Sequence, residues 1–462
     1  MRCRPGGVSA VQTATPASLP RRTRQGPGEA QRLLVITYNF PPDGFVGGLR
    51  WAGITKYLAR LGWKVTVVTA APPVDDAAVA GSEVERCKRL WTLADGVRWL
   101  RRSNGQSHAS VADAVGAGGS PHWSSPLLSL CREVSALATF PDESRGWVFR
   151  AALRARSVMR RFHPTVVVSS GPPHSAHLVA GMATLGTSVR WFIDLRDPWA
   201  GPFTKAWEPD RWTARTLLRS FERLAVLVAD GVITSTPDLA RALLRTYPAV
   251  PVECVPNGVD SEQLPSLAPD PYTGVSIAYA GTLYGSRDLG AVVQALRIFL
   301  DRHPEAALAG SRLRIAGRAE APHALALSRA VAAAGLEQWV EVMGPLSRAH
   351  ALRMLSRSHV AVVLAQEQDL QIPAKLYESV AMGIPTLVVA GAGSAAAVEG
   401  NRLGAVVRDP HDVDGIARML EELWHQRLQR GSRCPVPVTY EAIAPVVDEL
   451  FRNGGVQTRS CG

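Results

Sequence analysis

Short runs of apolar, β-branched residues alternate along the chain with longer segments in which apolar residues recur every three or four positions. Such runs are typical of buried strands in parallel sheets, and such segments are typical of the helices that connect these strands. The predicted strands form a first series at 33–38, 64–69, 165–169, 189–194, 231–234 and 252–255, and a second at 276–280, 312–316, 340–343, 359–364, 386–390 and 404–407. We therefore predict an α/β protein with two parallel sheets, each covered by helices.

The two series of strands indicate two domains joined by a linker. Residues 257–274 lie between the series, are rich in Pro, Gly and Ser, and show no periodicity. We therefore predict a first domain over 32–256 and a second over 275–430, both Rossmann-like and doubly wound. Doubly wound sheets bind ligands beyond the carboxyl ends of their strands, so a central cleft between the facing domains is the expected site.

Three segments fall outside this regular pattern. Residues 1–31 are rich in Pro, Gly and Arg and lack the apolar core of a secretory signal, so we expect a disordered basic tail on a cytoplasmic protein. Residues 71–145 interrupt the first domain with weak patterning, and we interpret them as an insertion. Residues 438–455 contain the sequence YEAIAPVVDELF, which predicts a last helix that crosses back to the first domain.

Composition excludes several classes of protein. Of the 462 residues, 46% are hydrophobic and 20% are charged, and no apolar run reaches the roughly 18 residues needed to span a bilayer. The six cysteines form no C-x-x-C pair, which argues against a zinc site and a disulfide framework. Outside the tail, the sequence indicates no basic groove with interleaved aromatic residues, so we expect no nucleic-acid partner.

A basic cluster in the first domain suggests a membrane contact. It consists of Arg150, Arg154, Arg160 and Arg161. Two tryptophans of the same region, Trp123 and Trp147, are predicted to be exposed. Basic side chains beside exposed aromatic rings suit an anionic membrane surface. A solvated helix face would carry the same arginines, so both interpretations stay open.

Three glycine-containing turns follow predicted strands. The first, in YNFPPDGFVGGLRW, places Gly47 and Gly48 before a helix, the second, in YAGTLYGSRD, contains Gly281 and Arg287, and the third, in LRIAGR, ends with Arg318. Glycine allows a phosphate to approach the backbone N–H groups at a helix start. A purely structural turn also favours glycine, so the turns alone do not decide between these roles.

The stretch QIPAKLYESVAMGIPTLVV predicts a short helix that leads into a strand. Pro373 suits the start of this helix, and Gly383 suits its end. Lys375 and Glu378 fall near its N-terminal end, where unpaired N–H groups and the helix dipole attract anions. This position predicts a phosphate site, although a surface ion pair would show the same spacing.

In order and spacing these segments resemble glycosyltransferase family 4 over nearly all of residues 32–455. The matching segments are YNFPPDGFVGG, FIDLRDPW, GVITSTPDLARAL, VPNGVD, YAGTLYGSRD, LRIAGR and PAKLYESVAMGIPTLVV. The resemblance implies the GT-B fold, a nucleotide-diphosphate sugar bound mainly by the second domain, and an acceptor bound mainly by the first.

The resemblance also assigns donor-binding roles. Glu378 aligns with the family's glutamate that holds the ribose hydroxyls, Lys375 then lies toward the diphosphate, and Arg287 stands at the family's second basic position. Gly47, Gly48, Gly281 and Arg318 complete the donor-binding candidates. Two positions depart from the family: Leu370 replaces another glutamate, and Thr282 replaces a frequent arginine.

On the first domain the family's histidine is replaced by serine or glycine in VVVSSGPPHSAH. We expect His174 to project into the cleft in its place and to join Arg287 and Lys375 as a catalytic residue, whereas His177 is expected to pack. The acceptor-side candidates are Asp194, Arg196, Asp197 and Trp147.

We therefore predict a retaining, hexosyltransferase-type enzyme of polysaccharide or glycolipid synthesis that uses neither a metal nor a cofactor. Its partners would be a nucleotide-sugar donor and a glycan or polyprenyl-linked acceptor, at the inner face of an anionic membrane. Arg287, Lys375 and helix N-termini would neutralise the leaving diphosphate. Two alternatives stay open: a catalytically inactive binding partner in a polysaccharide assembly complex, and a sugar-nucleotide epimerase.

Overall fold

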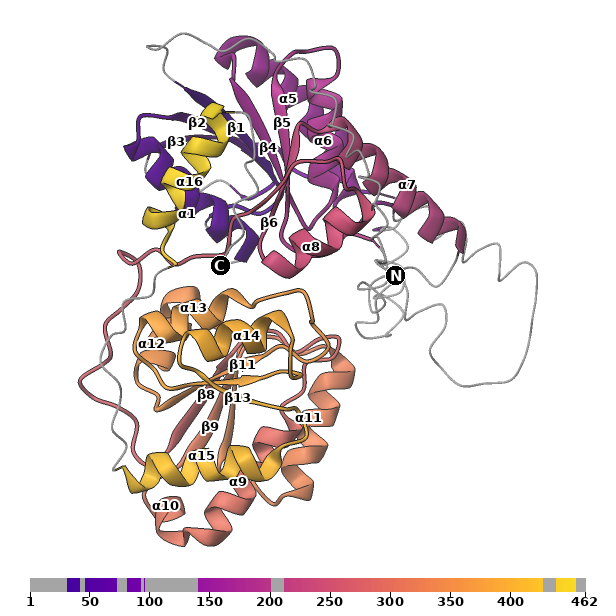
Figure 1. The fold of residues 1–462 in the computed structure, drawn as a ribbon. Coiled ribbons are helices and arrows are strands. Elements are labelled where there is room, and N and C mark those ends of the chain that lie inside the picture. The colour runs from indigo at the N-terminus through magenta and orange to yellow at the C-terminus, as the bar shows by residue number, and fades with distance from the viewer. Residues whose placement is uncertain are drawn as a thin grey trace, which may run out of the picture.

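The protein consists of two α/β domains that lie one above the other in the computed structural model (Figure 1). The structure describes residues 31–41, 46–72, 81–92, 95, 140–200, 212–426 and 438–453. Each domain is built on one parallel sheet with helices on both faces, so the predicted doubly wound α/β architecture is confirmed. No helix in the described ranges is long and apolar enough to cross a membrane.

The first sheet has seven parallel strands in the order β3-β2-β1-β4-β5-β6-β7. Its strands are β1 (Arg32–Thr37), β2 (Lys64–Thr69), β3 (Ser82–Arg86), β4 (Val166–Gly171), β5 (Arg190–Leu195), β6 (Gly231–Thr234) and β7 (Val252–Cys254). The central strand β1, RLLVIT, buries side chains on both faces: Leu33 and Val35 on one, Leu34 and Ile36 on the other. This two-sided burial explains its continuous apolar run.

Helices cover both faces of the first sheet. The Leu33 face packs against α1 (Val46–Arg60) and α16 (Tyr440–Asn453). The Leu34 face packs against η1 (Arg145–Trp147), α5 (Val148–Phe162), α6 (Ser175–Thr184), α7 (Trp212–Val228) and α8 (Pro237–Thr246). The helices that follow a strand begin on the carboxyl side of the sheet, as connections between parallel strands require.

The second sheet has six parallel strands in the order β10-β9-β8-β11-β12-β13. Its strands are β8 (Ser276–Ala280), β9 (Arg312–Ala316), β10 (Val340–Gly344), β11 (Val360–Leu364), β12 (Thr386–Val389) and β13 (Val406–Arg408). One face packs against α9 (Gly290–Arg302), α10 (Pro304–Leu308), α11 (Ala321–Ala333) and α15 (Val413–His425). The other face packs against α12 (Arg348–Ser356), α13 (Ala374–Ala381) and α14 (Ala395–Arg402).

The last helix, α16, packs on the first domain although it follows the second in the chain. Its Phe451 ring lies 5.8 Å from the ring of Trp63 and 5.3 Å from that of Phe192, measured between centroids. Val259, in the segment between the sheets, pairs with Thr439 just before the helix. One apolar cluster therefore continues from α1 and α16 to α12, α13 and α14.

The prediction of one insertion over 71–145 is wrong at its start. Residues 82–86 form β3, which pairs in parallel with β2 at the edge of the first sheet. This strand reads SEVER, and its polar, half-exposed residues carry no apolar run by which a strand is recognised. Most of the remaining interval, including Trp123, lies outside the described residues, as do residues 1–30.

Candidate active site

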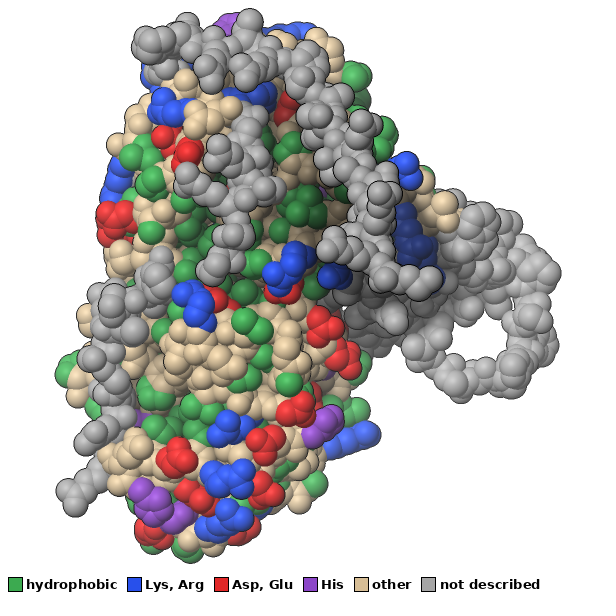
Figure 2. Space-filling view, viewed as in Figure 1, with side chains coloured by type: hydrophobic (Ala, Val, Ile, Leu, Met, Phe, Trp, Pro, Cys, Tyr) green, Lys and Arg blue, Asp and Glu red, His purple; other side chains and the backbone are tan. Residues whose placement is uncertain are grey.

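The candidate site lies where turns at the carboxyl ends of both sheets approach each other. Thr236, at the start of α8, donates a hydrogen bond of 2.6 Å to the carbonyl oxygen of Leu370 in the second domain. The Leu370 side chain packs against the apolar core of the first domain. A cavity of about 1070 Å³ is lined by Pro198 from the first domain and by the turns after β8, β11 and β13 of the second. Figure 2 shows basic side chains along this junction.

Arg287 stands on the turn after β8 and has no carboxylate within ion-pair distance among the described residues. Its guanidinium lies 4.4 Å from the ring centre of Tyr284, and its Nη2 donates to Gln368 at 3.4 Å. The buried Nε has no hydrogen-bond partner within the same ranges. Arg287 therefore holds a positive charge at the cleft that no protein carboxylate neutralises directly.

Lys375 lies in the first turn of α13, the short helix predicted between Pro373 and Gly383. Its Nζ is 5.7 Å from the ring centre of Tyr279, and a Cβ added at Gly281 would fall 2.3 Å from it. Burial, reinforced by the charge of Arg287, lowers the pKa of Lys375 to about 8. The ammonium group is therefore charged at neutral pH but poorly solvated, which favours binding of an anion.

Two glycines allow the turns after β8 and β9 to meet beside Lys375. Gly317 has φ +142°, and a Cβ there would fall 1.8 Å from the carbonyl oxygen of Gly281. The N–H of Gly281 donates to Ala316 at 2.7 Å. Arg318 follows on the same turn, where its side chain is exposed and its carbonyl accepts the N–H of Leu283 at 2.9 Å. Arg318 is thus at the rim, whereas Gly281 contacts Lys375.

Glu378 pairs with a residue that the sequence did not suggest. Its Oε1 lies 2.7 Å from Nη2 of Arg348, the first residue of α12. The side chain of Glu378 is 14% exposed and that of Arg348 is 30% exposed, so both remain partly accessible. Burial raises the pKa of Tyr440 on α16, and the charge of Glu378 adds to this effect. The predicted ribose ligand therefore lies close to the helix that joins the domains.

His174 and His177 fill the space in front of the glycine that ends β4. A Cβ at Gly171 would fall 2.9 Å from Nδ1 of His174 and 2.6 Å from Nε2 of His177. The His174 ring stacks on Trp199 at 4.7 Å, and Nδ1 of His177 lies 2.9 Å from Oγ of Ser169. Burial lowers the pKa of both rings, that of His177 to about 3, so both are neutral at pH 7.

Arg196 and Asp197 occupy the turn after β5. The guanidinium of Arg196 lies against Gly47, where an added Cβ would fall 2.3 Å from it, and donates to the carbonyl of Pro172. Burial lowers the pKa of Arg196 and raises the pKa of Asp197. The positive charges of Arg196 and, to a smaller extent, of Arg287 oppose the rise in the pKa of Asp197.

Gly48 has a packing role within the first domain. A Cβ at this position would fall 2.9 Å from Cα of Phe40. The first turn of α1 therefore lies directly against the backbone that follows β1. Gly48 allows this close contact, and Gly47 beside it leaves room for the guanidinium of Arg196.

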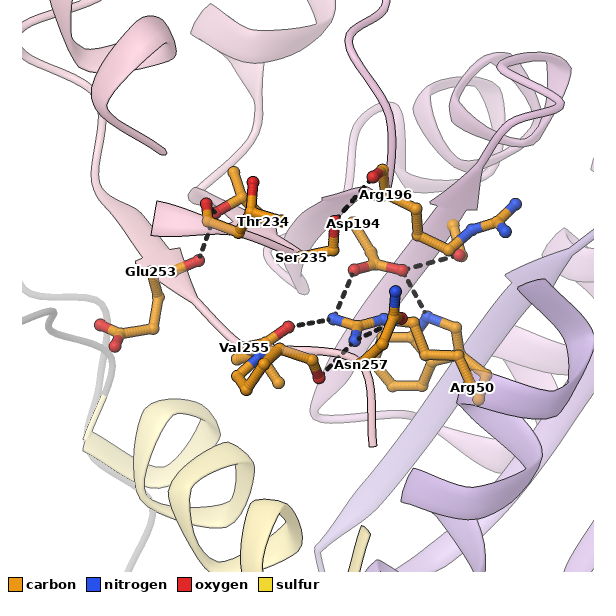
Figure 3. A network of polar contacts seen from close by, with 12 residues as sticks. Arg50, Asp194, Arg196, Thr234, Ser235, Glu253, Val255 and Asn257 are labelled. Carbon is orange, nitrogen blue, oxygen red and sulfur yellow. Dashed lines mark hydrogen bonds and ion pairs between the residues drawn. The ribbon is translucent and has the colours of Figure 1, made fainter. Parts of the chain in front are cut away.

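Asp194 is enclosed in a buried network (Figure 3). Its Oδ1 accepts from Nη2 of Arg50 at 3.1 Å, and its Oδ2 accepts from Nε1 of Trp51 and from Oγ of Ser170, each at 2.7 Å. Arg50 also donates to the carbonyls of Val255 and Pro256 and to the side chain of Asn257. The network thus ties α1, β5 and the start of the interdomain segment together.

Two of the predicted acceptor-side residues cannot contact an acceptor in this structure. Asp194 has no exposed surface, and both of its carboxylate oxygens accept hydrogen bonds within the network. Trp147 is also fully buried, and its ring meets the edge of Tyr38 at 5.5 Å. Arg196 and Asp197 retain partial exposure at the cleft and remain acceptor-side candidates.

Within the described ranges, no three His, Cys, Asp or Glu side chains come together as a metal-binding group would. The loop after β11 contributes amides and carboxylates to the cavity, among them Gln366, Glu367, Gln368 and Asp369. Gln366 donates to the carbonyl of Asp288 at 2.6 Å, and Gln368 accepts from Arg287. These bonds hold the loop after β11 beside the turn that carries Arg287.

Comparisons with known proteins identify both domains. Residues 49–263 match the family model described as Glycosyltransferase Family 4, and residues 276–426 match the model described as Glycosyl transferases group 1. No relative is found among curated proteins.

Solved structures show the same fold. The chain is similar to sucrose-phosphate synthase from Thermosynechococcus elongatus, with 14% identity, a TM-score of 0.58 and coverage of 92% of this chain and 98% of that one. It is also similar to HepE from Anabaena in complex with UDP and glucose, with 12% identity, a TM-score of 0.56 and coverage of 91% and 95%. At these identities the likeness establishes a shared two-domain GT-B fold.

Proposed function

Because the chain belongs to glycosyltransferase family 4, we propose that it transfers a sugar from a nucleotide-diphosphate sugar to a glycan or a lipid-linked acceptor. The observation that carries the proposal is the pair of cations at the cleft. The charge of Arg287 helps to lower the pKa of Lys375, and neither residue has a carboxylate ion-pair partner among the described residues. A diphosphate would supply the missing negative charge.

These cations suit a reaction whose leaving group is a diphosphate. The bond between the sugar's anomeric carbon and the phosphate oxygen breaks, and negative charge develops on the diphosphate. Preorganised cations stabilise that charge most in the transition state. In a retaining transfer the acceptor oxygen attacks from the face that the phosphate leaves, and its proton passes to the departing phosphate oxygen. No protein nucleophile is needed, and we propose that Arg287 and Lys375 replace a metal ion.

The donor's ribose would bind Glu378. Its carboxylate is held by Arg348 and is partly exposed, so it can accept hydrogen bonds from two neighbouring hydroxyls. Arg348 acts here as a positioning residue. The Anabaena structure contains UDP, so UDP-sugars are the first donors to test.

The acceptor would enter from the first domain. His174, Arg196 and Asp197 lie on turns at the carboxyl edge of its sheet, and each retains some exposure. A neutral imidazole at His174 can donate a hydrogen bond to a sugar hydroxyl or accept one from it. If the acceptor is lipid-linked, the enzyme works at the inner face of a membrane in polysaccharide or glycolipid synthesis.

Leu370 supports an alternative function, that of a binding partner without catalytic activity. It stands where the family has a sugar-binding glutamate, and its side chain packs on the first domain. A chain without that carboxylate would serve as a binding partner if turnover is lost. A sugar-nucleotide epimerase would need no acceptor.

One assay separates these functions. Purified protein is incubated with UDP-sugars and GDP-sugars, with and without a glycolipid extract, and sugar, nucleotide and isomer products are measured. We expect nucleotide release and a larger glycan product that require the extract. An isomerised donor formed without extract would indicate an epimerase, and tight donor binding without any product would indicate a binding partner.

A further inference from the structure

Three large apolar side chains are exposed together at one edge of the first domain. Trp91 follows β3, and Phe149 and Leu153 lie in the first two turns of α5. They are 71%, 62% and 59% exposed, respectively. Large apolar side chains grouped on a surface commonly mark a contact with another molecule or a membrane.

Basic side chains lie beside one of these apolar side chains, Leu153. A cavity of about 530 Å³ between the end of β3 and α5 is lined by Arg86, Lys88, Arg150 and Arg154, and its lining contains no carboxylate. Arg154 shares its charge with Glu85 at 3.6 Å. In the described part of the chain, Lys88 and Arg150 have no ion-pair partner. We call Lys88, Trp91, Phe149, Arg150, Leu153 and Arg154 the basic aromatic patch.

The segment that presents Trp91 is held in place by hydrogen bonds. Its neighbour Leu90 donates its N–H to Gly146 at 2.9 Å, and Arg89 pairs with Asp95 at 2.9 Å. Asp95 also accepts the N–H of Thr92 at 2.7 Å. Trp91 therefore lies in a turn whose neighbouring residues are hydrogen-bonded to Gly146 and Asp95.

We propose that the basic aromatic patch docks the protein on a bilayer that contains anionic phospholipids. Lys88, Arg150 and Arg154 would lie against the phosphates, while Trp91 and Phe149 enter the interface, where aromatic rings are favoured. A soluble anion would explain the cations but would leave the apolar side chains exposed to water. A bilayer would contact the cations through its phosphates and would bury the apolar side chains at its interface.

The position of the patch suits a lipid-borne acceptor. β3 ends and α5 begins on the carboxyl side of the first sheet, which is the side that borders the cleft. Docking there would bring the acceptor entrance toward the membrane. This inference rests on the lipid-linked form of the proposed function, although vesicle binding can be measured without any substrate.

The structure also separates the four arginines that the sequence groups together. Arg150 and Arg154 belong to the patch, whereas Arg160 lies in the last turn of α5, at the other end of that helix. Arg161, beside it, pairs with Glu83 and Glu85. Because Arg160 is exposed on the same helix, Arg160→Glu is a charge-matched control for Arg150→Glu.

The test is co-sedimentation of the full chain with vesicles of phosphatidylcholine, alone or mixed with phosphatidylglycerol, at low salt. We expect binding to the mixed vesicles. Arg150→Glu and Lys88→Glu should each weaken it roughly tenfold or more, because reversal removes one attraction and adds one repulsion. Trp91→Ser should weaken it at low and high salt alike, and Arg160→Glu should have little effect.

The proposal is overturned if the wild type does not bind mixed vesicles, or if Arg160→Glu weakens binding as much as Arg150→Glu. Circular dichroism and nucleotide binding without vesicles show whether each variant folds, and Lys88→Glu repeats the test on another element. Nucleotide release from the donor reports the proposed function separately. Vesicle binding without transfer would contradict the enzyme assignment alone, and transfer to a soluble acceptor without vesicle binding would contradict the docking surface alone.

Discussion

Two groups of charges, one in each domain, differ in how completely they are paired. In the first domain, Arg50 and Asp194 are both fully buried and form an ion pair, and all their polar side-chain atoms except Nε of Arg50 have hydrogen-bond partners. In the second, Arg287 and Lys375 lie near each other without a carboxylate in ion-pair contact among the described residues. Arg50 and Asp194 have no exposed surface, whereas Arg287 and Lys375 keep partial exposure. A charge that is both accessible and unmatched is the feature by which we distinguish a candidate binding site.

The largest expected effect is on stability, at the paired site. Asp194→Ala would leave Arg50 as a buried cation and would deprive Trp51 and Ser170 of their acceptor. Breaking a buried pair in this way typically costs about 3 to 5 kcal/mol. Denaturant titration should show this loss in the free energy of unfolding. A variant as stable as the wild type would mean that the network contributes little.

Lys375→Met should increase the stability of the protein, unlike Asp194→Ala, and should decrease its turnover. The pKa of Lys375 falls from 10.5 to about 8 on folding, so the folded state is penalised below pH 8 and the penalty fades between pH 8 and 10.5. The variant should therefore gain roughly 1 kcal/mol or more at pH 7. Its turnover should fall about 10²- to 10³-fold.

The deprotonation of Lys375 also predicts a pH dependence of donor binding in the wild-type protein. Donor affinity should weaken as the pH rises through 8, because Lys375 then loses its proton, and Lys375→Met should not show this transition. A Met variant that is less stable at pH 7, or that keeps the transition, would contradict this role of Lys375.

A smaller effect is expected at the ribose position. Glu378→Ala should raise the donor KM by about tenfold and lower kcat by no more than that, because ribose contacts exist both before and during transfer. Arg348→Ala should also raise the donor KM, but by a smaller factor. Arg348→Lys should raise it less than Arg348→Ala does. Steady-state kinetics with varied donor measures both constants. A loss confined to kcat would mean that Glu378 acts on the reacting groups instead.

The smallest effect is expected at the histidine pair. His174→Ala should lower turnover up to roughly tenfold through the loss of one hydrogen bond. His177 is more buried and is bonded to Ser169, so His177→Ala should instead lower stability by about 1 to 3 kcal/mol. Turnover and thermal unfolding of both variants test this division. Equal effects on turnover would leave His174 without a distinct role.

The fold could be predicted from the sequence where apolar runs were long and buried on both sides. β1 and β11 are such strands, and the Pro and Gly around α13 fixed both of its ends: it runs from Ala374 to Ala381, and Gly383 has φ +78°. β3 was missed because an edge strand with alternating charges has no apolar run.

The candidate site was only partly predictable, because charge pairing depends on contacts distant in sequence. Arg348 and Glu378 are thirty positions apart, and no local pattern links them. Asp194 and Asp197 look alike in FIDLRDPW, yet only Asp194 meets Arg50 of α1. Trp147 among arginines looked like a surface residue, although its ring fills the core beside Tyr38.

The central claim is that Arg287 and Lys375 bind the donor's diphosphate, and calorimetric titration with UDP and with UMP tests it most directly. Arg287→Ala should weaken UDP binding by roughly tenfold or more, as expected for a charge-assisted contact, and should affect UMP much less. Arg318→Ala, which removes an exposed arginine from the adjacent turn, should leave both affinities close to those of the wild type. If Arg287→Ala weakens UDP and UMP equally, or leaves UDP binding unchanged, the two cations do not hold the diphosphate.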